Sequence, residues 1–249
     1  MIKERIKLIA TLGVALLVAS FAAEAQQTGR IARIGYLAPG FPTANAPLLG
    51  AFRDGLRMHG YVEGRNLAIE FRFAEGRFEW LPRLAAELVA IKPDVIFAAG
   101  TLAAKPAAQA TKTIPIVMLA GDPVGSGLVT SLAKPGGNVT GVTNLSVELA
   151  AKRISLLREA LPSITRVGVL MNPVSPIGPP QLKDTEAAAR SFGWEVIPLE
   201  AQAASDYEPA FAVAIRKRVH ALVILVDPLQ FAFRHTELML PKDTIDGVE

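Results

Sequence analysis

The sequence contains no cysteine. This absence excludes disulfide bridges, thiolate chemistry and cysteine-ligated metal sites, and it also excludes a lipid-anchored export signal, which requires a cysteine. The three histidines, His59, His220 and His235, stand at predicted helix ends or in the tail, without the spacing of metal ligands. We therefore expect no metal site and no cofactor, and a fold that its hydrophobic core alone stabilises.

The excess of positive over negative charge is also small. The formal net charge is +3, and the first 25 residues hold three basic residues against Glu4 and Glu24, which leaves +2 for the remainder. Basic residues are scattered, and the single run of them at 216–218 is typical of a solvated helix end. Electrostatic binding to nucleic acid needs a concentrated basic patch, so we expect no nucleic-acid partner.

The N-terminus has the pattern of a secretory signal peptide. Three basic residues within the first seven positions precede an uncharged apolar run at 8–22, and Ala23-Glu24-Ala25 supplies the small-x-small pattern of a cleavage site. The apolar run is shorter than the ~20 residues of a membrane-spanning helix, which disfavours a membrane anchor. We predict that residues 1–25 are a signal peptide, that the mature chain begins at Gln26, and that the protein is periplasmic.

From Gln26 onward, short apolar runs alternate with longer amphipathic segments. Strands are predicted at 31–37, 67–73, 94–98, 114–119, 166–171, 194–199 and 221–226, and helices at 47–59, 80–91, 101–111, 148–161, 181–192 and 207–218. This alternation indicates an α/β fold with parallel sheets. The glycine-rich stretch 122–146 interrupts it, so we predict two Rossmann-like lobes, an N-terminal lobe at 26–145 and a C-terminal lobe at 146–249.

In open parallel sheets, ligands bind at the carboxyl ends of the strands. Gly100 and Thr101 follow one predicted strand and open a helix, whose free N–H groups favour an anion; a simple N-cap role for Thr101 is the alternative. Asp122 and Asp227 each end an apolar strand, one in each predicted lobe, and Asn172 ends another. Each aspartate either receives an ammonium or hydroxyl group of a ligand or caps the turn at the following proline.

Signatures of catalysis and of nucleotide binding are missing from the sequence. Gly121, Gly125 and Gly127 have a spacing that fits neither the dinucleotide fingerprint nor the phosphate loop, and no Gly-x-Ser-x-Gly elbow occurs. An exported α/β enzyme, the alternative reading, would need a nucleophile, an acid–base pair or a cofactor loop at the strand ends. Only isolated carboxylates stand there, so we expect a binding protein rather than an enzyme.

Several stretches carry motifs that occur together in one family. They are IARIGYLAPG at 31–40, DPVGSGLV at 122–129, KPGGNVTGV at 134–142 and RVGVLMNP at 166–173. The combination of DPVGSGLV and KPGGNVTGV behind a signal peptide is specific. From about residue 31 to residue 227, the chain resembles the tryptophan/tyrosine-type substrate-binding proteins of ABC transporters.

The resemblance implies a type I periplasmic-binding-protein fold, in which a ligand cleft separates two α/β lobes. It also implies an extracytoplasmic component of an ABC importer, which binds a small amino-acid-like or carboxylate solute and works with permease subunits in the inner membrane. By this pattern Gly100 and Thr101 meet the ligand carboxylate, with Asp122 nearby. Asn172 and Asp227 close from the second lobe, and Asp227 receives an amino group.

The sequence departs from the family pattern at its end. Residues 229–249 provide about one helix and a polar tail, where family members continue with further elements of both lobes. We therefore expect the second lobe to be incomplete, and a non-functional truncated fragment is the alternative to a working binding protein. Where the second lobe folds, we expect Thr101 and Asp227 to face each other across the cleft.

Overall fold

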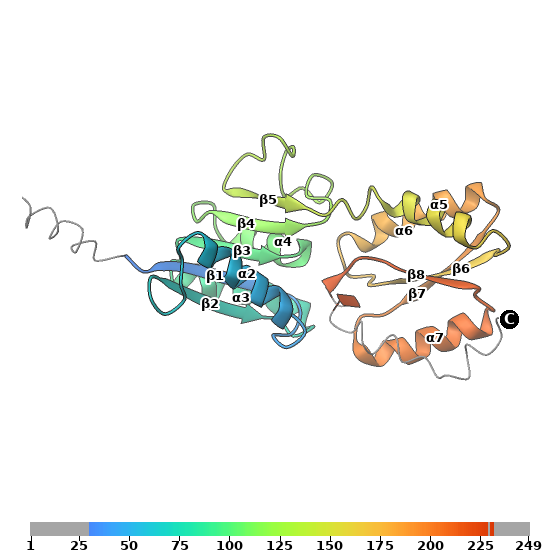
Figure 1. Ribbon diagram of the computed structural model, residues 1–249, viewed down its shortest axis with the longest axis horizontal. Helices are drawn as coiled ribbons and strands as arrows, with labels where there is room; N and C mark the ends of the chain where they lie inside the picture. Colours follow the sequence, from blue (N-terminus) through green and yellow to red (C-terminus); the bar gives the residue numbers. More distant parts are fainter. Residues whose placement is uncertain (1–29, 229, 232–249) are drawn as a thin grey trace, which may run out of the picture.

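The protein, described here from a computed structural model that covers residues 30–228, 230 and 231, has two parallel sheets, each flanked by helices (Figure 1). The first sheet has the order β2-β1-β3-β4-β5 and the second the order β7-β6-β8. The first contains β1 (Ala32–Ala38), β2 (Leu67–Phe73), β3 (Val95–Ala99), β4 (Ile116–Ala120) and β5 (Val139–Thr143). The second contains β6 (Arg166–Met171), β7 (Glu195–Glu200) and β8 (Ala221–Ile224).

The helices follow the strands in the chain and cover both faces of each sheet. The first lobe has α2 (Ala46–Met58), α3 (Leu81–Ala90) and α4 (Thr101–Ala110), with a short 3-10 helix, η1 (Phe78–Trp80), before α3. The second lobe has α5 (Ala150–Ala160), α6 (Gly178–Ser191) and α7 (Tyr207–Arg216), with η2 (Ala204–Asp206) before α7. None of the helices within the described ranges is long and apolar enough to cross a membrane.

In the first lobe, alternate residues of β1 supply two separate cores. Leu37 packs with residues of α3 and α4 on one face, whereas Ile34 and Tyr36 pack with residues of α2 on the other. The ring of Tyr36 lies 5.5 Å from that of Phe52 and 5.2 Å from that of Phe97, and burial raises the pKa of its phenol. A strand that is covered on both faces must be apolar at nearly every position, which is the pattern of β1.

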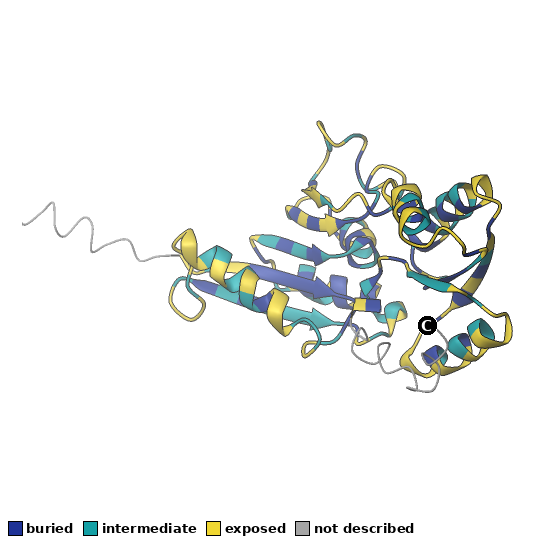
Figure 2. Cartoon of the chain, turned by 45° about the vertical axis from the view of Figure 1, so that its right-hand side comes forward, coloured by how far each residue is buried: buried dark blue, intermediate teal, exposed yellow. Residues whose placement is uncertain are grey.

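The second lobe repeats this arrangement on a smaller sheet. Val169 belongs to the core under α5 and α6, and the next residue, Leu170, belongs to the core under α7. β6 is the central strand of its sheet, and its last five residues are buried. The burial colours show that exposed residues lie mainly on helices and loops around the sheets (Figure 2). The two lobes therefore have separate hydrophobic cores, and the chain passes between them after β5.

The predicted fold class, two α/β lobes with parallel sheets, is confirmed, and the predicted strands lie within about two residues of the observed ones. The prediction was wrong at 139–143, which it left inside the glycine-rich break although this segment forms the edge strand β5. Gly141 interrupts its apolar pattern, and the edge position leaves most of its side chains exposed. The predicted boundary at 145/146 stays a prediction, and residues 1–25 lie outside the described range.

We predict that Gly141→Ala destabilises the protein by about 3 kcal/mol, because Gly141 has a φ of 148° and an added Cβ would lie 2.0 Å from the carbonyl oxygen of Met118. Urea unfolding followed by circular dichroism measures the change. Gly55→Ala in α2 is the control, since nothing lies within 4 Å of its added Cβ and alanine favours the helix. Equal stability of the two variants would contradict the assigned pairing of β5 with β4.

Candidate functional site between the two lobes

A cavity of about 200 Å³ lies between the lobes, where the carboxyl ends of both sheets meet. From the first lobe it is lined by residues that follow β1, β3, β4 and β5, among them Pro39, Thr101, Gly121 and Asn144. From the second lobe it is lined by residues that follow β6 and β8, among them Ser175, Ile177 and Asp227. The position agrees with the general location of ligand sites in open parallel sheets.

Thr101 is the first residue of α4 and is 4% exposed. Its Oγ1 donates a hydrogen bond to the carbonyl oxygen of Gly121 at 2.8 Å and accepts one from the N–H of Gly121 at 3.1 Å. The N-cap of α4 is Gly100, so the alternative interpretation of Thr101 as the N-cap was wrong. Thr101 instead joins the start of α4 to the end of β4, which fixes this wall of the cavity.

The start of α4 presents backbone donors at the cavity. Gly100, Thr101 and Leu102 all line it, and the first N–H groups of a helix have no partner within the helix. Gly100 adopts a φ of 97°, which favours glycine, and an added Cβ there would lie 3.3 Å from Cγ of Pro228 in the second lobe. Helix N–H groups and the helix dipole together favour a negatively charged group at this end of the cavity.

Asp227 provides a carboxylate from the opposite lobe. It follows β8 and is 5% exposed, and its Oδ1 accepts a hydrogen bond of 3.2 Å from Nδ2 of Asn172. Asn172 follows the neighbouring strand β6, is 1% exposed, and accepts a hydrogen bond from the N–H of Val174 with its Oδ1. Asp227 therefore places a nearly buried carboxylate at the second-lobe side of the cavity.

The structure separates Asp122 from the other predicted residues. Asp122 has a φ of 43°, and its Oδ1 accepts a hydrogen bond of 2.8 Å from the N–H of Gly125, as a turn-capping side chain does. It does not line the interlobe cavity, whereas Gly100, Thr101 and Asp227 do. Asn172 does not line the cavity either, but it donates a hydrogen bond to Asp227, which does. Ligand contacts for these five residues stay predictions, and this geometry gives Asp122 the weakest support.

Sequence reasoning missed several residues of the cavity. Asn144 follows β5, a strand that the prediction omitted, and Ser175 lies three residues beyond Asn172. The rule of polar residues at strand ends could not find them, because β5 was not predicted and Ser175 lies four residues beyond the end of β6. No sequence signal marked the apolar part of the wall, which includes Leu119 at the end of β4 and, from helices and loops, Leu48, Ile177, Val226 and Phe231.

The two lobes approach each other closely at Gly121. A Cβ added to Gly121 would lie 3.0 Å from Cδ1 of Ile177 and 2.4 Å from Oγ of Ser146. Gly121 belongs to the first lobe and Ile177 to the second, so the absence of a side chain at Gly121 permits the contact between them. Glycine is common where one segment must approach another this closely.

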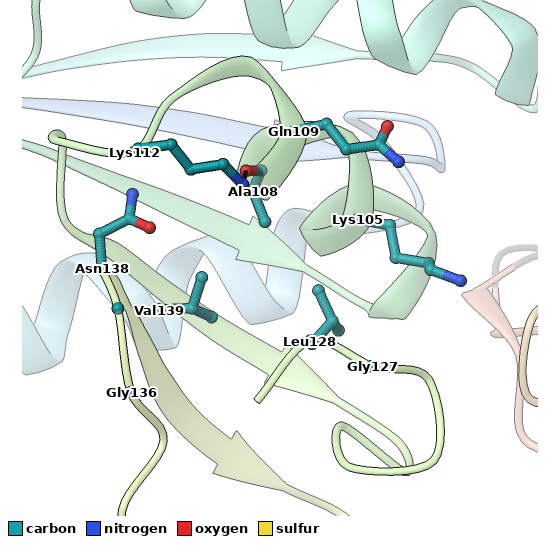
Figure 3. A pocket seen from close by; sticks show the side chains of 10 residues that line it. Lys105, Ala108, Gln109, Lys112, Gly127, Leu128, Gly136, Asn138 and Val139 are labelled. Carbon is teal, nitrogen blue, oxygen red and sulfur yellow. Dashed lines mark hydrogen bonds between the residues drawn. The ribbon is translucent and has the colours of Figure 1, made fainter. Parts of the chain in front are cut away.

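A second depression, of about 270 Å³, lies on the first lobe beside Lys105, Lys112 and Asn138 (Figure 3). Nζ of Lys112 donates to the carbonyl oxygen of Ala108, and Nδ2 of Asn138 donates to two backbone carbonyls, so both side chains stabilise the local turns. This depression lies where β4 and β5 begin, at the edge opposite to their carboxyl ends. Its position makes it a weaker candidate site than the interlobe cavity.

Within residues 30–228, 230 and 231, no group of three or more histidine, aspartate or glutamate side chains is placed to hold a metal ion. The interlobe cavity combines helix N–H groups on one side, a buried carboxylate on the other and apolar walls between them. This arrangement suits a small zwitterion with an apolar body.

A protein family, a curated relative and two solved structures are similar to this chain. The sequence profile of the family described as ABC transporter substrate binding protein matches residues 44–233. A tyrosine-binding protein of Clostridioides difficile is 33% identical over 180 residues, which cover 72% of this chain and 51% of that protein. The chain therefore spans about half the length of this curated relative.

Two solved structures are similar over most of the chain. A conserved domain protein from Vibrio cholerae has a TM-score of 0.77 and 28% identity, and the match covers 84% of this chain and 70% of that one. An ABC domain from Streptococcus pneumoniae in complex with L-Trp has a TM-score of 0.76 and 26% identity, with 86% and 71% covered. At 28% and 26% identity, both proteins are similar to this chain in sequence as well as in fold.

We predict that Thr101→Val destabilises the protein by about 2 kcal/mol, because it leaves the buried N–H and carbonyl groups of Gly121 without the hydroxyl that now pairs with both. Thr101→Ser keeps the hydroxyl and should cost less than about 1 kcal/mol. Denaturant unfolding of the two variants beside the unchanged protein measures both effects. If valine and serine cost the same, the bridge to Gly121 does not stabilise the start of α4.

Proposed function

This chain belongs to the family of ABC transporter substrate-binding proteins, and from that membership we propose that it binds a small amino acid for an importer of that type. It has the type I periplasmic-binding-protein fold, with two α/β lobes and parallel sheets. In this proposal the solute binds in the interlobe cavity, and the lobes hold it until a permease receives it. Export through the signal peptide at 1–25 and a periplasmic location belong to the same proposal.

One observation carries the choice of an amino acid. The start of α4 and the carboxylate of Asp227 line the same cavity from opposite lobes. A ligand carboxylate at the N–H groups of Thr101 and Leu102 and a ligand ammonium at Asp227 would place both charges of a zwitterion beside complementary groups. Neither lobe supplies both partners, so binding would require the lobes to be close together.

The size and the walls of the cavity favour an apolar or aromatic side chain. Its volume of about 200 Å³ is below the ~300–1,000 Å³ that is typical of sites for drug-sized ligands, so a single amino acid is a better match. Leu48, Leu119 and Phe231 supply apolar surface beside the polar groups. The relatives named for tyrosine and crystallised with L-Trp support an aromatic amino acid as the first candidate.

Binding without chemical conversion is the role we infer for this cavity. General acid–base catalysis needs a donor and an acceptor of protons within reach of the same ligand. Among the described residues that line the cavity, Asp227 alone has an ionisable side chain. The residue that bonds to it, Asn172, is a neutral amide. The chain spans about half the length of its curated relative. For this reason we propose, on the basis of family membership alone, that it takes part in transport and works with permease subunits in the inner membrane.

We predict that the full chain binds L-tryptophan or L-tyrosine in calorimetric titration, and that Asp227→Asn weakens the binding by about 2–5 kcal/mol. The substitution keeps the shape of the side chain and removes the charge that the ligand ammonium would meet. Glu200→Gln is the matched control, since Glu200 is an exposed carboxylate at the end of β7, on the same sheet edge but outside the cavity.

Two results would count against this proposal. If neither aromatic amino acid binds the unchanged protein, nor any other amino acid in a panel, the proposed ligand class is wrong. If an amino acid binds and Asp227→Asn leaves its affinity unchanged, the ammonium does not contact Asp227.

A further inference from the structure

Gln181 lies in the first turn of α6, and its amide side chain is completely buried. Its Oε1 accepts a hydrogen bond of 3.2 Å from the N–H of Val226, and its Nε2 donates one of 3.1 Å to the carbonyl oxygen of the same residue. The side chain therefore pairs with both backbone groups of Val226, as a neighbouring strand would. The next residue in the chain is Asp227.

The chain needs this partner because strand pairing stops shortly before Asp227. β8 ends at Ile224, and the N–H of Leu225 makes the last backbone bond to β6, with the carbonyl oxygen of Leu170 at 3.0 Å. Beyond that point the N–H and carbonyl groups of Val226 have no strand partner, and although the residue is 40% exposed, both groups pair with the buried Gln181 side chain. The Gln181 side chain supplies both hydrogen-bond partners, so the backbone conformation directly before Asp227 is fixed.

Arg153 connects Gln181 to the segment between the lobes. Nη1 of this α5 side chain donates to the carbonyl oxygen of Ser146 at 3.2 Å and lies 3.5 Å from Oε1 of Gln181. Burial lowers the pKa of the guanidinium. Ser146 belongs to the crossover segment 144–149, which runs from β5 of the first lobe to α5 of the second.

The crossover has a strained backbone at its centre. Leu145, directly before Ser146, has a φ of 51°, which is unfavourable for a residue with a branched side chain. The N–H of Ser146 donates to Oδ1 of Asn144, and its carbonyl oxygen accepts from Arg153. Strain of this kind persists where neighbouring contacts fix the conformation, and hinges between domains are short segments that absorb changes in backbone angles.

We propose that Gln181 is a positioning residue of the ligand site, which holds Asp227 in place through Val226 and, through Arg153, links that position to the crossover. This inference rests on the proposed binding of an amino acid in the interlobe cavity. When the lobes move relative to each other, the crossover changes shape, and the shared guanidinium transmits the change to the Gln181 side chain. The position of the Asp227 carboxylate, which would contact the ligand ammonium, then depends on how the lobes are arranged.

The primary test compares Gln181→Met with Thr185→Val in the full chain. Methionine has a similar length and cannot pair with Val226. Thr185 lies one turn further along α6, is also buried, and donates its hydroxyl to the backbone carbonyl of Gln181 at 2.7 Å, without contact to Val226. The variants are compared by the hydrogen exchange rate of the Val226 amide and by calorimetric titration with L-tryptophan and L-tyrosine.

We expect Gln181→Met to accelerate exchange at Val226 and to weaken amino-acid binding by about tenfold or more, because the part-buried pairing of Gln181 with both backbone groups of Val226 is lost beside the site. Thr185→Val should leave both quantities within about twofold of the unchanged protein. Arg153→Met, at a half-buried position, should keep the protection of Val226 and weaken binding by about threefold. It provides a second variant if Gln181→Met does not fold.

The outcomes separate the positioning role from the proposed function. If Gln181→Met and Thr185→Val lower the affinity equally, or if Val226 exchanges at the same rate in all variants, Gln181 has no positioning role. If Gln181→Met does not fold and Arg153→Met binds like the unchanged protein, the link to the crossover is refuted. If the unchanged protein binds no amino acid, the proposed function fails, and the exchange rate of Val226 alone decides whether Gln181 fixes the approach to Asp227.

Discussion

Parallel strand direction is the constraint on which the site depends. Because all strands within each sheet run the same way, the carboxyl ends of β1, β3, β4 and β5 meet at one edge, and those of β6 and β8 meet at another. The chain crosses from one lobe to the other after β5, and the two edges enclose one cavity. Polar residues that follow different strands, among them Thr101, Asn144 and Asp227, thereby line the same small volume without any local sequence motif.

Side chains complete the backbone pairing that ends at these edges. Thr101 bonds to both backbone groups of Gly121, and Gln181 bonds to both backbone groups of Val226. One of these bridges lies in each lobe, directly beside a group that we assign to ligand contact. The energetic need to pair buried backbone groups therefore also produces a rigid frame for the ligand.

The sequence was sufficient for the fold because periodic apolar runs mark each buried strand and helix. It was insufficient for β5, where Gly141 and an exposed edge hide the pattern. For the site, the rule of polar strand ends located Thr101 and Asp227 but could not distinguish them from Asp122, which caps a turn. Gln181 lies within a helix, and only its contact with Val226, 45 residues away along the chain, reveals its importance.

The most direct test of the central claim is a crystal structure of the full chain grown with L-tryptophan. We expect one ligand between the lobes, with its carboxylate at the N–H groups that open α4 and its ammonium beside Asp227. A ligand in the depression beside Lys105, or one in the cavity with its ammonium away from Asp227, would contradict it.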